Sequence, residues 1–187
     1  MSLTSLPNLL SLSRIPLGIV LFACMSYQLW LVGLVVFLVA TLTDWLDGWL
    51  ARRWNQVSLI GRNLDPLTDK FLICGAFIYF IPITSAGILP WMVTLIVGRE
   101  ILITGLRGIV EATGKTFAAD RWGKIKTALQ CAVIIGALLL LWLKQSEIAP
   151  ETWPALDIVQ TTLLYAMLLA TIGSGLQYVA KAAKLLA

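Results

Sequence analysis

The chain has 187 residues, of which 59% are hydrophobic and 13% are charged, and its mean hydropathy is +0.87. A soluble domain of this length could not bury so much apolar surface, whereas helices in a bilayer leave theirs against lipid. The net charge of +4 therefore indicates membrane topology and contact with anionic head groups, and we expect no nucleic-acid partner. Because the chain has no histidine, histidine acid–base chemistry and histidine metal ligation are excluded.

Apolar segments follow one another along the whole chain. Residues 3–13 predict a short N-terminal interfacial helix, although this segment could instead complete the first span, which is short on its own. The spans are predicted over about 14–27, 30–52, 64–82, 89–110, 125–143 and 155–180. Turn-forming residues separate the later spans, namely Gly87, Pro90, Gly114, Pro150 and Pro154. We therefore expect an all-α integral membrane protein with six transmembrane helices, forming a single membrane-embedded domain over residues 1–187.

The basic residues predict the orientation of these spans. If both termini are cytoplasmic, then of the fourteen lysines and arginines only Lys144 lies on the opposite side. This is the positive-inside pattern expected of a six-span protein.

Four aspartates occur at or near the ends of the second and third spans. A carboxylate in the membrane costs about 2.5–3.5 kcal/mol, so four of them need compensating positive charge. At 100° per residue Asp44 and Asp47 share one helix face, and Asp65 and Asp69, four residues apart, share another. The short connection makes the two helices antiparallel neighbours, so these faces can meet. Paired carboxylates suit Mg²⁺ or Mn²⁺, and four of them suit a two-metal site.

Small residues and an arginine accompany the aspartates. Gly48 and Ala51 lie on the face of Asp44 and Asp47, where they leave room for a bulky ligand such as a nucleotide. Arg52 lies on the same side and can bind a phosphate through its forked guanidinium. Space, carboxylates and a guanidinium together predict a site for a metal-bound pyrophosphate.

The complete spacing is Asp44-x2-Asp47-Gly48-x2-Ala51-Arg52-x8-Gly61-x3-Asp65-x3-Asp69. With all eight positions matched, the sequence resembles the CDP-alcohol phosphotransferase family. The resemblance implies that family's fold, an active site on the cytoplasmic side of a bacterial inner membrane, and a homodimer, with a mitochondrial relative as the alternative source. The alternative interpretation is that the aspartates are helix-cap and loop charges at the membrane surface.

The resemblance also implies roles for these residues. Asp44, Asp47 and Asp65 match metal ligands, and Asp69 matches the general base, which can also contact the second of two Mg²⁺ or Mn²⁺ ions. The positions assigned to CDP binding are Gly48, Ala51, Arg52, Gly61 and Asn8, although a helix-cap role for Asn8 is an equal alternative. In the implied reaction the base takes a proton from an alcohol, the alcohol oxygen attacks phosphorus, and CMP leaves.

A second group of charges concerns the alcohol acceptor. Arg99 and Arg107 lie eight residues apart in GREILITGLRG, and Lys124 and Lys126 lie in GKIKT. Arginine within a span usually faces the protein interior, so these cations predict a site for the phosphate of an anionic acceptor such as glycerol 3-phosphate. Alternatively, Arg99 pairs with a carboxylate such as Glu100, and the lysines are ordinary charges at a helix end.

The segments PNLLSLSR, GREILITGLR and GKIKTALQ also resemble the bacterial family members that join CDP-diacylglycerol to glycerol 3-phosphate. We therefore expect these two substrates, with membrane lipid as the surroundings. Other hypotheses keep the chemistry but use phosphatidylglycerol, serine or inositol phosphate as the acceptor. A divalent-cation transporter would also explain the aspartates but not Arg52 among them, and a non-catalytic scaffold would leave the acidic group unexplained.

Overall fold

The computed structural model describes residues 6–54, 59–114 and 121–186. For residues 6–11, 44–54, 59–67, 69, 121 and 186 it describes the backbone alone. Within these residues the secondary structure is entirely helical, as the sequence predicts.

Six α-helices make up the fold, and two 3-10 turns lie in the connections. The α-helices are α1 (Leu6–Ser26), α2 (Trp30–Trp54), α3 (Leu59–Phe80), α4 (Pro90–Ala112), α5 (Arg121–Gln145) and α6 (Trp153–Leu186). The 3-10 turns are η1 (Thr84–Ala86) and η2 (Pro150–Thr152). Gly87 and Gly114 have φ angles of 67° and 77°, a region that glycine adopts without strain, and they follow η1 and α4 as the turn signals predict.

Of the two interpretations of the N-terminal segment, the structure contradicts the separate short helix and agrees with the segment completing the first span. A single helix, α1, runs from Leu6 to Ser26, so the segment that was expected to lie apart extends the first predicted span. No turn-forming pair interrupts the sequence there, and the helix continues past Pro16, which removes one backbone hydrogen bond from it. The resulting helix of 21 residues has the length needed to cross a bilayer.

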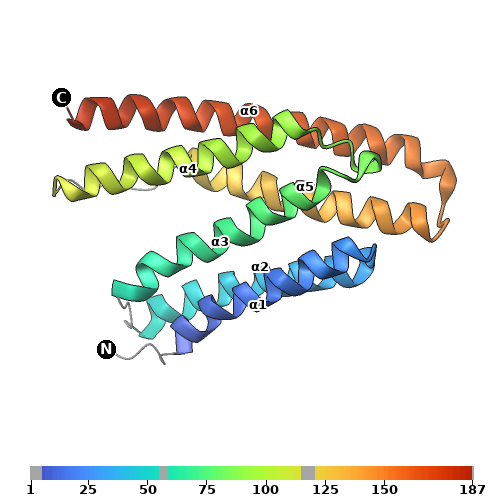
Figure 1. The fold of residues 1–187 in the computed structure, drawn as a ribbon, viewed down its shortest axis with the longest axis horizontal. Helices are drawn as coiled ribbons and strands as arrows, with labels where there is room; N and C mark the ends of the chain where they lie inside the picture. Colours follow the sequence, from blue (N-terminus) through green and yellow to red (C-terminus); the bar gives the residue numbers. More distant parts are fainter. Residues whose placement is uncertain (1–5, 55–58, 115–120, 187) are drawn as a thin grey trace.

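Successive helices run in alternating directions along one long axis (Figure 1). As a result, α1 begins and α6 ends at the same end of the molecule, and α2, α3, α4 and α5 each have one end there as well. Helix α1 packs against both α2 and α3, α5 packs against α2 and α6, and α4 packs against α6 and α3.

The main core joins all six helices through apolar side chains. Phe37, Phe77 and Phe80 in it are fully buried, and leucine, isoleucine and alanine side chains fill the space around them. A second, smaller cluster between α4 and α6 consists of Ile103, Val110, Tyr178 and Ala182. This second cluster keeps α6 against the part of α4 that carries Arg99 and Arg107.

Aromatic packing holds α1 against α3. The Phe22 ring stacks on Tyr79 with centroids 4.9 Å apart and meets Phe71 edge-on at 5.4 Å. Opposite the ring is Gly75, where a Cβ atom would lie 2.1 Å from Phe22 Cζ. The glycine therefore permits a close approach that any larger residue would prevent.

Two described helical segments are long and apolar enough to cross a membrane, Trp122–Gln145 and Pro150–Leu185. Shorter apolar stretches occupy Leu12–Ser26, Trp30–Thr43 and Lys70–Phe80. An all-helical membrane protein is thus supported, while the crossing of a bilayer by all six helices stays a prediction.

Candidate functional site

The predicted acidic site lies on two helices joined by four residues of chain. Asp44, Asp47, Gly48, Ala51 and Arg52 belong to the last part of α2, and Gly61, Asp65 and Asp69 belong to α3. Asn8 lies within α1 rather than before its first residue. The side chains of all nine residues lie outside the part of the structure that is described, so their roles remain predictions.

The described structure shows a cluster of charged side chains next to this region, with Glu100 of α4 at its centre. Lys126 of α5 donates a hydrogen bond to Glu100 Oε1, and Arg99 Nη1 donates to the same oxygen at 3.2 Å. The side chains of Lys126 and Glu100 are only 5% and 8% exposed. Water therefore screens this ion pair little, and removal of either charge would leave the other buried without compensation.

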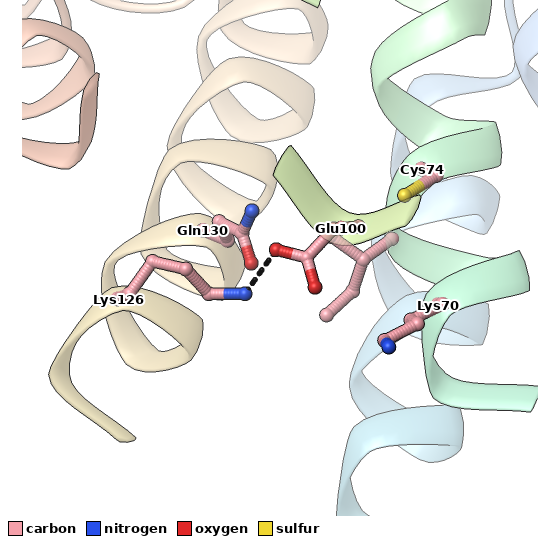
Figure 2. Close-up of a pocket in the computed structure, with 6 residues that line it drawn as sticks. Lys70, Cys74, Glu100, Lys126 and Gln130 are labelled. Carbon is pink, nitrogen blue, oxygen red and sulfur yellow. Dashed lines mark hydrogen bonds and ion pairs between the residues drawn. The ribbon is translucent and has the colours of Figure 1, made fainter. Parts of the chain in front are cut away.

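Glu100 also faces a small pocket between α3, α4 and α5 (Figure 2). Lys70, Ile73, Cys74, Glu100, Lys126 and Gln130 line it. Figure 2 shows the Glu100 carboxylate between Lys126 on one side and Lys70 on the other. Lys70 donates a hydrogen bond to the hydroxyl of Thr104, one turn after Glu100 on α4. Gln130 is 1% exposed, and its Nε2 has no hydrogen-bond partner among the described residues, so the pocket offers a buried donor as well as two ammonium groups.

Helix α6 contributes to the other side of the cluster. Arg99 Nη2 donates a hydrogen bond to Ser174 Oγ at 3.1 Å, and the guanidinium lies 5.6 Å from the centroid of the Tyr178 ring. Arg99 thus bridges α4 and α6, and Lys126 and Glu100 bridge α5 and α4. Together these contacts bring cationic side chains from α3, α4 and α5 to one place.

The four residues predicted to bind the acceptor phosphate differ in their surroundings. Arg99 and Lys126 meet at Glu100, and the predicted alternative partner of Arg99 is indeed in contact with it. Arg107 lies within electrostatic range of Lys70, and its buried Nε has no hydrogen-bond partner in the described part of the chain. Lys124 is exposed. Among the described residues, the cluster therefore has more positive than negative charge around Glu100.

Sequence reasoning did not single out Lys70, Gln130, Ser174 or Tyr178. Lys70 follows Asp69 directly, and Gln130 lies one helical turn after Lys126, so their spacing was a usable signal. Ser174 and Tyr178 gave none, because they are two polar residues in a long apolar helix and Ser174 is 75 positions from Arg99.

Known proteins resemble this chain over nearly its whole length. A family model described as CDP-alcohol phosphatidyltransferase matches residues 4–181. A protein of Bacillus subtilis named "CDP-diacylglycerol--glycerol-3-phosphate 3-phosphatidyltransferase" is 38% identical over 81% of this chain and 73% of its own length. Proteins of the same name from Salmonella paratyphi A and Shigella flexneri are 34% identical over 95% of this chain and 94% of theirs.

The part of the chain that the structure describes is entirely helical, and it includes two helices long and apolar enough to span a bilayer and a buried charged cluster, features consistent with a membrane protein. The match over residues 4–181 shows that the chain belongs to the CDP-alcohol phosphatidyltransferase family, and it is an enzyme of that type. The family expected from the aspartate spacing is thereby confirmed.

Proposed function

We propose that this enzyme transfers the phosphatidyl group of CDP-diacylglycerol to glycerol 3-phosphate, forming phosphatidylglycerophosphate and CMP. It would then be a phosphatidylglycerophosphate synthase of phospholipid biosynthesis. The observation that carries the proposal is the similarity, over most of both chains, to relatives whose name states this reaction. The signature spacing at residues 44–69 supports the same chemistry.

The four aspartates fit a divalent cation by their chemistry. Their carboxylate oxygens are the hard donors that Mg²⁺ and Mn²⁺ prefer, and they come in two pairs on α2 and α3, the helices joined by residues 55–58. We assign Asp44, Asp47, Asp65 and Asp69 to the metal site, with two ions as the expected number. Bound there, the ions would neutralise the pyrophosphate and stabilise charge on the transferred phosphoryl group.

The remaining residues of the signature would hold the donor and start the reaction. Arg52 would bind a phosphate of the CDP group, with Gly48, Ala51, Gly61 and Asn8 shaping the nucleotide site. Asp69 would take the proton of the acceptor hydroxyl while the hydroxyl oxygen forms the new bond to the phosphatidyl phosphorus. The bond between this phosphorus and the CMP oxygen breaks, so that CMP leaves with the bonding electrons.

The charged cluster supports an anionic acceptor. Position 69 lies one helical turn before Ile73, which lines the pocket with Lys70, Glu100 and Lys126. A phosphate held by Arg99, Arg107 and Lys126 would therefore lie near the proposed base on α3. Lys70 joins this site by its position, and Lys124, which is exposed, would meet the acceptor as it enters. An acceptor without a phosphate, such as serine, would leave the cations without a ligand.

Several wider features belong to the same proposal. The chain would act as a single membrane-embedded catalytic domain, in a homodimer, in the bacterial inner membrane. Both termini and the active site would face the cytoplasm.

The test is a transfer assay with purified protein in mixed micelles containing CDP-diacylglycerol, labelled glycerol 3-phosphate, and Mg²⁺ or Mn²⁺. We expect labelled phosphatidylglycerophosphate and one CMP per product, both abolished by EDTA and by Asp65→Asn. Product formation from phosphatidylglycerol, inositol phosphate or serine, with none from glycerol 3-phosphate, would overturn the acceptor assignment. An Asp65→Asn protein as active as the wild type would overturn the metal-site assignment.

A further inference from the structure

Three residues of α6 surround the side chain of Arg99. Ser174 Oγ accepts a hydrogen bond from Arg99 Nη2 at 3.1 Å, and the Tyr178 ring faces the guanidinium at 5.6 Å. Between them is Gly175, where a Cβ atom would lie 3.4 Å from Arg99 Cγ. The stem of the arginine thus passes over the glycine, and its charged end lies between a hydroxyl and an aromatic face.

The Ser174 hydroxyl can act only as an acceptor toward Arg99. Its own hydrogen is donated to the carbonyl oxygen of Thr171 at 3.1 Å, one turn earlier on α6. Ser174 is fully buried, so water does not compete for the oxygen. The remaining lone pair therefore points at Arg99, which cannot be an acceptor.

Tyr178 is held as firmly as Ser174. It is 4% exposed and packs in the cluster with Ile103, Val110 and Ala182, between α4 and α6. A Cβ atom on Gly123, near the start of α5, would lie 3.2 Å from the Tyr178 hydroxyl oxygen. The ring consequently cannot turn away from Arg99 without disturbing the contacts of two other helices.

These contacts use only part of the donor capacity of Arg99. Nη1 donates to Glu100 and Nη2 to Ser174, while Nε is buried and has no hydrogen-bond partner among the described residues. Nη1 and Nη2 each carry a second N–H group, so a phosphate can still receive hydrogen bonds from the end of the guanidinium. The arginine is oriented without being saturated.

We propose that Ser174 and Tyr178 are positioning residues, which hold the Arg99 guanidinium beside Glu100 and Lys126 in the orientation that receives the acceptor's phosphate. This inference rests on the proposed function. A free arginine side chain has many conformers, and ordering it on binding weakens affinity. Helix α6 orders it during folding instead, so loss of either contact weakens the acceptor's binding more than that of CDP-diacylglycerol.

The test uses the full-length enzyme with Ser174→Ala and Tyr178→Leu, and measures kcat and the KM of each substrate. We expect the KM for glycerol 3-phosphate to rise about tenfold, as for the loss of a hydrogen bond to a charged group, and the KM for CDP-diacylglycerol to change less than about twofold. Tyr178→Phe keeps the ring face and should raise the KM for glycerol 3-phosphate less than Tyr178→Leu does. Thr162→Ala and Tyr165→Leu are matched controls on the exposed side of α6 and should leave both KM values unchanged.

A double-mutant cycle separates positioning from general support of the fold. Once Arg99→Ala has removed the guanidinium, Ser174→Ala should raise the KM for glycerol 3-phosphate by less than about twofold further. If Ser174→Ala does not fold, Ser174→Cys keeps the shape with a weaker acceptor and takes its place in the cycle.

Two results would overturn the inference. One is an equal rise in the KM of both substrates, and the other is an undiminished effect of Ser174→Ala in the Arg99→Ala protein. A wild type that makes no product from glycerol 3-phosphate would instead overturn the proposed function, and the inference with it.

Discussion

Two ion pairs in this protein show how burial decides what a charge contributes. In the Lys126–Glu100 pair the side chains are 5% and 8% exposed, whereas in the Lys144–Asp157 pair the lysine side chain is 26% exposed and the aspartate 46%. Lys144 Nζ contacts both Asp157 oxygens, at 2.7 and 2.9 Å, so the second pair is the better one by geometry. Burial nevertheless matters more than geometry for the stability lost when one partner of an ion pair is removed. Water takes the place of the missing partner of an exposed charge but cannot do so for a buried charge.

We therefore predict that Glu100→Gln destabilises the protein far more than Asp157→Asn. The first substitution leaves the buried Lys126 ammonium and Arg99 without their carboxylate and should cost about 3–5 kcal/mol. The second should cost about 0–1 kcal/mol, because the Lys144 ammonium is then hydrated. Thermal unfolding of the purified variants in detergent measures both. Equal shifts in melting temperature would mean that water reaches the Glu100 carboxylate.

At the scale of single residues, the sequence indicated which charged residues are important better than it indicated which residues contact them. Arg99 and Lys126 stand out as cations within apolar segments, and Glu100 was a foreseeable partner because it is adjacent to Arg99. The contact of Arg99 with Ser174 depends on how α4 and α6 pack, and no local pattern contains that information. Lys70 was foreseeable only if the signature had been extended by one residue.

At the scale of elements, the helices were predictable but their exact extents were not. Apolar runs and the turns at Gly87 and Gly114 indicated all six, because lipid-facing helices are recognisable from composition alone. The polar ends of the helices were harder to predict. Helix α3 begins five residues before the third predicted span, and α6 ends six residues after the sixth. Helix continues there although hydrophobicity has ended, because backbone hydrogen bonding does not require an apolar side chain.

Glycines at helix contacts give the element-scale prediction. Gly75→Ala should lower the melting temperature, because the new methyl group meets the Phe22 ring, which Phe71 and Tyr79 hold in place. Overpacking of this kind costs about 1–3 kcal/mol, more than the gain in helix propensity of about 1 kcal/mol. At Gly105 of α4 a Cβ atom meets no atom within 4 Å, so Gly105→Ala should be neutral or stabilising.

A compensating substitution checks the cause of the Gly75 effect. Phe22→Leu shortens the side chain opposite Gly75, so it should destabilise the wild type but recover part of the stability of Gly75→Ala. Independent, additive losses in the double variant would show that the two positions do not collide.

At the scale of the whole molecule, the alternating helices place the end of α6, with Lys184 in its last turn, and the end of α5, with Lys144 in its last turn, at opposite ends of the bundle (Figure 1). Helix α6 has 34 residues, so it is about 51 Å long at 1.5 Å per residue, well beyond the hydrocarbon thickness of about 30 Å. Its last turns, with Lys181 and Lys184, therefore extend past the bilayer if Trp153 lies at the opposite interface. The positive-inside pattern of the basic residues predicts that the end of the bundle where α6 terminates is cytoplasmic.

We predict that the α5–α6 connection and the end of α6 are on opposite sides of the membrane. Single cysteines at Glu147 and Lys184, both exposed, would be introduced after the native Cys24, Cys74 and Cys131 are replaced by alanine. In intact cells an impermeant maleimide should label Glu147→Cys, and should label Lys184→Cys only after permeabilisation. Gln28→Cys, in the exposed turn between α1 and α2, should behave like Glu147→Cys, because an even number of crossings separates the two positions. Labelling of Glu147→Cys and Lys184→Cys from the same side would mean that α6 does not cross the bilayer, and the reverse pattern would put the proposed active site outside the cytoplasm.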